Sequence, residues 1–335
     1  MQLASIEFEG NAIVAARFDS KRLIDVNELL RIVETGARQT RIYSMKALIS
    51  GGESLRRGLV AGLEAARNDI RRVDCIDRDK IAWYPPVRDP GKICAVAMNN
   101  SASNSRKISA PDHPAFFLKP ASCLIGHGES IRVRPYYGSV HPEPELAVVI
   151  GKQTKDTPAK SALEAVYGYT IFNDVTSNGM RAEDMFHYWA VYAKADNPDE
   201  TERVEQHLSY AARYKGSDTF GVMGPWLTTR DEIDDPDDLD VACKVGGETV
   251  AEDSTRYYNY KVAEVVSFIS YFHTLYPGDV ISLGTAFKAG SHRRSIHHAN
   301  FQTVPGPVEI SIEGLGTQRN EIVIENVELG KWRLG

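Results

Sequence analysis

The segment His141-Pro142-Glu143-Pro144-Glu145-Leu146-Ala147-Val148-Val149-Ile150 joins an acidic head to an apolar run and predicts a buried β-strand. Side chains alternate between the two faces of a strand, so His141, Glu143 and Glu145 can all point the same way. Pro144 donates no backbone hydrogen bond, which places this segment at a strand start or a sheet edge. Two carboxylates on one face repel each other unless a cation neutralises them. The alternative is a solvated strand end with two surface glutamates.

A third acidic residue ends another apolar run. Asp174 follows the strand that we predict at residues 167–172, and it comes 29 residues after Glu145. That separation allows the two strands to be neighbours in a sheet. Three carboxylates suit a hard cation such as Mg²⁺ or Mn²⁺, whereas structural zinc prefers cysteine and histidine. The sequence therefore predicts a site for a divalent metal at Glu143, Glu145 and Asp174.

Short strands separated by glycine and proline turns are predicted throughout the chain after residue 91. They cover residues 92–97, 115–118, 130–133, 146–150, 167–172, 279–283 and 308–312. Strands at this density favour a sandwich or roll over a doubly wound parallel sheet. One helix is predicted among them, with Asn197 as N-cap, Pro198 at the first helical position and Gly216 just past its end.

The first 85 residues predict a small α/β domain. Two strands are expected at residues 6–9 and 12–18, joined by a turn at Gly10-Asn11. Helix formers fill residues 43–70, and Gly51-Gly52 interrupts them, which favours two helices over one. A linker rich in proline follows. We therefore place an N-terminal domain at residues 1–85 and a catalytic domain at residues 90–335.

The composition excludes several classes of protein. The 335 residues carry a formal net charge of −6, whereas a nucleic-acid-binding protein typically has an excess of basic residues. No apolar run approaches the ~20 residues of a membrane span, and the first residues do not resemble a signal peptide. Four cysteines lie far apart, so free buried thiols are expected rather than disulfides or a zinc site. A cytoplasmic protein without nucleic-acid or membrane partners is expected.

Five segments, in the right order, resemble the fumarylacetoacetate hydrolase (FAH) family. The resemblance covers roughly residues 90–315, and its segments are 143–152, 168–176, 215–220, 224–226 and 275–285. It implies an α+β, β-rich fold in which an FAH-type mixed β-sandwich roll forms the catalytic domain, beside the small N-terminal α/β domain. It also implies a homodimer with Mg²⁺ or Mn²⁺ in the site.

The resemblance assigns roles to particular residues. Glu143, Glu145 and Asp174 would be the metal ligands. Lys215 would hold a substrate oxyanion or carboxylate near the metal, and Thr285 would line the substrate pocket. Without the surrounding motif, the preferred interpretation of Lys215 is a lysine at a helix C-terminus, where the helix dipole favours a positive charge.

The chain departs from the family in two places. Family hydrolases commonly carry a lid of the form Asn-Tyr-x-x-His-x-x-Glu, whose His and Glu activate water. In the corresponding segment, residues 99–106, Ser103 replaces the histidine and Arg106 replaces the glutamate. After Asp174 the sequence also departs from the family pattern, and residues 182–213 resemble an insertion. A remodelled substrate pocket is therefore expected.

The insertion offers a replacement for the missing base. Glu183 and His187 are four residues apart, so a helix would place them on one face as a displaced His/Glu pair. An ordinary surface helix explains this spacing equally well. His141 is expected to orient a metal ligand rather than act as a base. Arg106 and Arg181 could bind a substrate carboxylate through two hydrogen bonds each, or could simply be exposed.

Three functional hypotheses follow from the resemblance. The first is a divalent-metal-dependent hydrolase that cleaves a C–C bond in an acylpyruvate, a diketo acid or a related β-diketone during catabolism. The second is a 2-keto acid lyase (decarboxylase, hydratase or dehydratase) on the same metal site, because enolate formation does not need the missing His/Glu pair. The third is a family member without enzymatic activity, against which the intact Glu143, Glu145, Asp174 and Lys215 argue.

Overall fold

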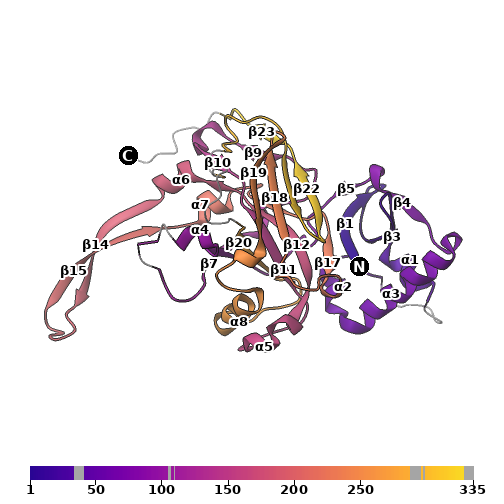
Figure 1. The fold of residues 1–335 in the computed structure, drawn as a ribbon, viewed down its shortest axis with the longest axis horizontal. Helices are drawn as coiled ribbons and strands as arrows, with labels where there is room; N and C mark the ends of the chain where they lie inside the picture. The colour runs from indigo at the N-terminus through magenta and orange to yellow at the C-terminus, as the bar shows by residue number, and fades with distance from the viewer. Residues whose placement is uncertain (34–40, 105–106, 109, 287–295, 297–298, 328–335) are drawn as a thin grey trace.

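The computed structural model describes residues 1–33, 41–104, 107–108, 110–286, 296 and 299–327 (Figure 1). Within these residues, a 13-stranded mixed sheet runs through the molecule. Its main path follows the order β4 (Cys75–Asp77), β3 (Arg22–Asp25), β2 (Asn11–Arg17), β1 (Gln2–Phe8), β17 (Leu227–Thr229), β12 (Val166–Asp174), β11 (Pro144–Ile150), β20 (Val280–Thr285), β6 (Ile93–Ala97) and β7 (Ala115–Lys119). Three short strands branch from this path: β5 (Ala82–Trp83), β8 (Leu124–Ile125) and β16 (Gly221–Met223).

Smaller sheets and short helices complete the described fold. A four-stranded sheet has the order β19 (Glu248–Ser254), β18 (Asp240–Val245), β21 (Val308–Ile312) and β22 (Gly316–Asn320). Pairs of strands are β9 (Ile131–Val133) with β23 (Ile322–Ile324), β10 (Val140–His141) with β13 (Thr176–Ser177), and β14 (Met185–Ala193) with β15 (Thr201–Ser209). The α-helices are α1 (Val26–Arg31), α2 (Met45–Ser50), α3 (Gly52–Asn68), α4 (Ser101–Asn104), α5 (Ala159–Ala162), α6 (Asn178–Glu183), α7 (Ala212–Gly216) and α8 (Val262–Phe272).

Strand β11 is buried on both faces, which explains its uninterrupted apolar sequence. Leu146 and Val148 belong to a hydrophobic core shared with the four-stranded sheet. Ala147 and Val149 belong to a second core, which is shared with helices α1 to α3 of the N-terminal region. The predicted strands are confirmed, and so is the β-rich α+β fold built around packed sheets.

The N-terminal strands and helices form largely as predicted. Strands β1 and β2 pair as a hairpin, but its turn lies at Glu9-Gly10, where both residues have positive φ (49° and 75°), one residue earlier than expected. Helices α2 and α3 are separated at Gly51, as predicted. Strand β1 also pairs with β17, so the main sheet continues across the proposed boundary at residues 85–90. That domain boundary remains a prediction.

The helix expected from Asn197 to Gly216 is wrong. Residues 201–209 form strand β15, and only Ala212–Gly216 is helical. Asn197-Pro198 instead starts the turn between β14 and β15: the N–H of Glu200 donates to the Asn197 carbonyl at 3.0 Å. Asparagine and proline serve a turn as readily as a helix start, and the β-branched and aromatic residues on both sides favour strands. This hairpin projects from the body of the molecule (Figure 1).

The four cysteines are unpaired, as expected; three are buried and Cys75 is half-buried. In the part of the chain that the structure describes, no helix has the length and apolar character needed to cross a membrane.

Candidate metal centre

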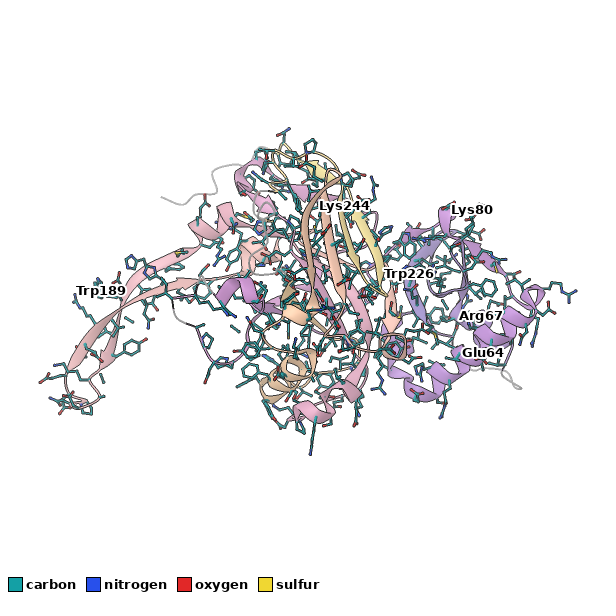
Figure 2. All side chains as sticks on the ribbon, in the orientation of Figure 1. Glu64, Arg67, Lys80, Trp189, Trp226 and Lys244 are labelled. Carbon is teal, nitrogen blue, oxygen red and sulfur yellow. The ribbon has the colours of Figure 1, made fainter. Side chains whose placement is uncertain are left out.

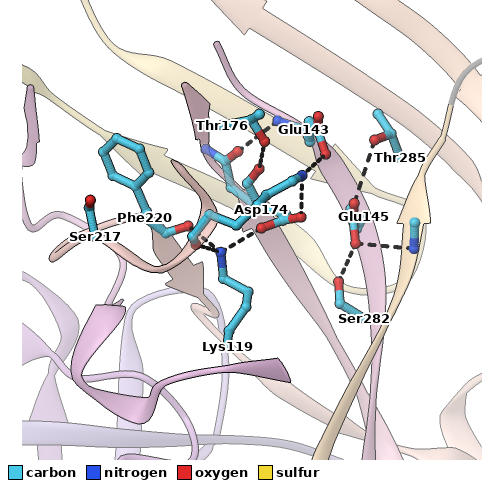
Figure 3. Close-up of polar contacts among 12 residues, drawn as sticks. Lys119, Glu143, Glu145, Asp174, Thr176, Ser217, Phe220, Ser282 and Thr285 are labelled. Carbon is cyan, nitrogen blue, oxygen red and sulfur yellow. Dashed lines mark hydrogen bonds and ion pairs between the residues drawn. The ribbon is translucent and has the colours of Figure 1, made fainter. Parts of the chain in front are cut away.

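Three carboxylates converge where strands β11 and β12 meet (Figure 3). Pro144 pairs with Asn173 in the register of these strands, so Glu143 and Asp174 lie side by side at their ends. The Asp174 N–H donates to the Glu143 carbonyl at 3.0 Å. One oxygen from each of Glu143, Glu145 and Asp174 lies within 4.8 Å of the others, as the strand pattern predicts.

Strand β20 holds Glu145 in place. The Ser282 hydroxyl donates a short hydrogen bond to Glu145 Oε2, and the Gly284 N–H donates to the same oxygen at 3.1 Å. Gly284 has φ of 94°, and a Cβ there would lie 3.0 Å from the Val96 carbonyl oxygen, so the position requires glycine. Thr285 follows, and its hydroxyl lies 3.5 Å from Glu145 Oε1. This places Thr285 beside the carboxylates, where the resemblance predicts a pocket residue.

The segment that replaces the family lid is tied to the same strand. Asn99 Nδ2 donates to the Leu283 carbonyl at 2.8 Å, and Asn100 Nδ2 donates to the Thr285 carbonyl at 3.1 Å. Ser103 lies in the short helix α4 that follows. Arg106, predicted as a substrate-binding residue, lies outside the described residues. The two asparagines therefore fix the backbone that presents Thr285.

Two lysines neutralise the carboxylates. Lys215, near the end of α7, places Nζ 2.6 Å from Glu143 Oε2 and 2.6 Å from Asp174 Oδ2. Lys119, the last residue of β7, places Nζ 2.5 Å from Asp174 Oδ1. Its ammonium also donates to the carbonyls of Lys215 and Phe220. Lys119 therefore joins Asp174 to the segment that carries Lys215.

The pKa values at the centre move in opposite directions. Burial raises the pKa of Glu145 well above its usual range, and the neighbouring charges of Asp174 and Glu143 raise it further. Burial also opposes the charged form of Glu143, but Lys215 and a hydrogen bond with His141 outweigh it and hold the Glu143 pKa below its usual range. Burial lowers the pKa of Lys215, yet the three carboxylates raise it overall.

The centre fits a divalent cation. Its donors are carboxylate oxygens, which Mg²⁺ and Mn²⁺ prefer, and Glu145 and Asp174 are almost fully buried. The Lys215 ammonium already bridges Glu143 and Asp174, which shows that this position favours positive charge. His141 Nε2 lies 3.3 Å from Glu143 Oε1, close enough to orient this ligand as the sequence predicts.

Sequence analysis missed Lys119. The apolar run Ala115–Leu118 was predicted as a strand, but that strand extends by one residue, to Lys119. A lysine that ends an apolar run directly before Pro120 was the available signal. A lysine is almost never fully buried unless it is paired, and only the folded chain shows that its partner is Asp174.

Replacing Lys119 with methionine should destabilise the fold by about 3–5 kcal/mol, because it breaks a buried ion pair and leaves part of the Asp174 charge uncompensated. Urea unfolding of the metal-free protein measures this cost. Lys152→Met is the matched control, since Lys152 forms an exposed pair with Glu164 at 3.4 Å, which should contribute at most about 1 kcal/mol. Equal stability of the two variants would contradict a stabilising contribution from the buried pair of Lys119 and Asp174.

The displaced His/Glu pair is not assembled as predicted. Helix α6 ends at Glu183, and His187 lies in strand β14, so the helix that was to align them is wrong. The Glu183 carboxylate contacts Arg213 at 3.0 Å, and His187 contacts Glu205 on the neighbouring strand. Arg181 lies exposed on α6. The structure does not join these three side chains to the carboxylate centre, and their roles remain predictions.

The chain is similar in sequence to a known family and to known proteins. Residues 92–323 match a protein family described as fumarylacetoacetate (FAA) hydrolase C-terminal. The chain is 30% identical over 266 residues to "Oxaloacetate tautomerase FAHD2A, mitochondrial" of Bos taurus, which covers 78% of this chain and 77% of that protein.

Solved structures show the same fold. The structure is similar to that of maleylpyruvate hydrolase from Sphingobium sp. SYK-6, with a TM-score of 0.69 and 25% identity over 97% of this chain and 100% of the other. A second structure of that hydrolase, in complex with manganese(II) and pyruvate, has a TM-score of 0.68 and 24% identity over 97% and 99% of the two chains.

Proposed function

Because the chain belongs to the fumarylacetoacetate hydrolase family, we propose that it is a divalent-metal-dependent hydrolase that cleaves a C–C bond in an acylpyruvate, a diketo acid or a related β-diketone. The observation that carries this proposal is the convergence of Glu143, Glu145 and Asp174 within 4.8 Å, with the Lys215 ammonium against them. Such a centre offers both a cation site and a fixed positive charge to an anionic keto acid.

Different residues of the chain would hold the metal ion, stabilise negative charge on the substrate and line the substrate pocket. When bound, a divalent cation supplies Lewis acidity to the keto and carboxylate oxygens of the substrate. Lys215 keeps its proton because the carboxylates raise its pKa, so its ammonium can hold the negative oxygen that develops as the C–C bond breaks. Thr285, fixed through the Asn100 side chain, lines the place where the substrate would lie.

A second candidate is a reaction that proceeds through an enolate without hydrolysis of a C–C bond: a 2-keto acid lyase, as the missing His/Glu pair suggests, or a keto–enol tautomerase. Two observations favour it. Ser103 stands where hydrolases of the family carry the water-activating histidine. A relative that is 30% identical is named an oxaloacetate tautomerase. Hydrolysis additionally requires a general base for water, a role that sequence analysis assigned to the His187 and Glu183 pair.

Turnover of a substrate panel should separate these candidates. The panel contains acylpyruvates, β-diketones and oxaloacetate, each with Mg²⁺, with Mn²⁺ and with EDTA, and products are identified by mass and by proton exchange. The expected result is metal-dependent C–C cleavage, which gives two acids from an acylpyruvate and an acid with a ketone from a β-diketone. Release of CO₂, loss of water or keto–enol exchange without C–C cleavage would instead establish the second candidate. No metal-dependent turnover across the panel, combined with no metal binding, would favour a family member without activity.

The other properties implied by the resemblance are part of the same proposal. A related hydrolase was crystallised with manganese, which supports Mn²⁺ as well as Mg²⁺ for this chain. A homodimer and a cytoplasmic location remain predictions; the bovine relative is named as mitochondrial.

A further inference from the structure

The projecting hairpin carries a second group of metal-ligating side chains. His187 of β14 pairs directly with His207 of β15, and Trp189 pairs with Glu205. Residues two apart in a strand share a face, so His187, His207 and Glu205 all lie on one face of the hairpin. One ligand atom from each lies within 4.8 Å of the others. The carboxylate centre includes none of these three side chains, and only His187 has another predicted role, as a general base.

The three side chains already converge. His187 Nε2 forms a short contact with Glu205 Oε1. The rings of His187 and His207 stack nearly parallel, with centroids 4.2 Å apart and 9° between their planes. All three side chains are exposed, so small rotations can adjust their donor atoms without moving the backbone. The strand register therefore brings the three side chains close together, and rotation of the side chains can set the geometry around an ion.

We propose that His187, Glu205 and His207 bind Zn²⁺. Two imidazole nitrogens and one carboxylate form a donor set that zinc accepts, with a fourth position left open for water or another group. The choice of metal follows from the donors: imidazole suits zinc, whereas the oxygen-only centre of Glu143, Glu145 and Asp174 suits Mg²⁺ or Mn²⁺. The chain thus separates two kinds of divalent cation between its body and its hairpin.

An ion bound at this site would stabilise the hairpin. Among the residues that the structure describes, strands β14 and β15 pair only with each other, and they extend away from the main sheet (Figure 1). The hairpin carries exposed aromatic side chains such as Trp189 (Figure 2). A two-stranded ribbon is at best marginally stable alone in water. An ion held by both strands stabilises the paired form, because it binds the folded hairpin and not the separated strands.

One charge on the same face opposes a cation. Arg203 lies two residues before Glu205 on β15 and is exposed. Water and salt screen charges that are exposed in this way. The carboxylate of Glu205, which contacts His187, is therefore the nearer and stronger influence on the ion.

Equilibrium dialysis tests the proposal. The untagged full chain is dialysed against Zn²⁺ at low micromolar concentration with millimolar Mg²⁺ to occupy the carboxylate centre, and bound zinc is measured by mass spectrometry. The unaltered chain should retain zinc. His207→Ala and Glu205→Gln should each weaken it at least about tenfold, since loss of even an indirect contact to a metal ligand costs about 10–100-fold. Glu202→Gln, which removes the same charge from the other face of β15, is the matched control.

Digestion by trypsin gives a readout that is independent of zinc content and of turnover. Lys194 lies where the hairpin turns, just beyond the end of β14. Zinc should slow cleavage there in the unaltered chain and in Glu202→Gln, but not in His207→Ala. The proposal is overturned if the unaltered chain retains no zinc, or if His207→Ala and Glu205→Gln retain it as tightly as Glu202→Gln. Because failure of this site leaves the carboxylate centre intact, it is distinguishable from failure of the hydrolase proposal.

Discussion

Replacing Glu143 with glutamine should weaken Mn²⁺ binding by at least about 100-fold and reduce turnover to background. The substitution keeps the size of the side chain but removes one of the three carboxylates whose oxygen atoms lie within 4.8 Å of one another. A neutral amide is a poorer ligand for a hard cation than a carboxylate, and loss of even an indirect contact to a ligand costs about 10–100-fold in metal affinity. Direct titration with Mn²⁺ measures the effect.

The fold should survive this substitution. Lys215 keeps its contact with Asp174 at 2.6 Å, so its ammonium retains a partner. The unaltered protein should unfold at a higher temperature when Mn²⁺ is added, because the ion binds only the folded state. Glu143→Gln should lose that increase. The matched control is Glu164→Gln, which alters an exposed glutamate. Unchanged turnover of Glu143→Gln in metal-stripped buffer would refute the metal assignment.

The carboxylate centre could be predicted from sequence because its signals are local. Strand β11 is buried on both faces, so its residues form an unbroken apolar run with Glu143 and Glu145 at its head. Asp174 marks the end of β12 in the same way. Neighbouring strands that each end in an acid bring those acids together, and the register of β11 with β12 does so here.

The contacts between distant segments could not be predicted in this way. Lys119 meets Asp174 across 55 residues of sequence, and Ser282 meets Glu145 across 137. A single polar residue after an apolar strand has no periodicity, so nothing in the sequence selects its partner. These contacts depend on the order of strands in the sheet, which places β20 beside β11.

The hairpin was missed for a different reason. Exposed strands need no apolar face, and β14 carries aromatic or aliphatic residues on both faces, including Phe186, Trp189 and Val191. The alternation that identifies a half-buried strand is therefore absent. Asn197-Pro198 then resembled the start of a helix, although it begins a turn.

Replacing Lys215 with methionine should separate catalysis from metal binding. The Lys215 ammonium lies 2.6 Å from both Glu143 Oε2 and Asp174 Oδ2, so in the metal-free protein it competes with a divalent cation for these oxygens. Methionine keeps the apolar stem and removes the charge. Mn²⁺ affinity should therefore stay equal or increase. Turnover should fall by about 10²–10³-fold, the cost of losing one group that stabilises a developing oxyanion.

The two effects of Lys215→Met have opposite signs, and that contrast distinguishes its roles. A lysine that only holds the carboxylates in place would lose metal affinity and turnover together when replaced. A lysine that stabilises the negative oxygen of the reacting substrate would lose turnover while the ion binds at least as well. Parallel titrations with Mn²⁺ and kinetics at saturating Mn²⁺ measure both, with Lys152→Met as the exposed control. Loss of both Mn²⁺ affinity and turnover would show that Lys215 holds the carboxylates of the metal centre in place rather than stabilising the substrate.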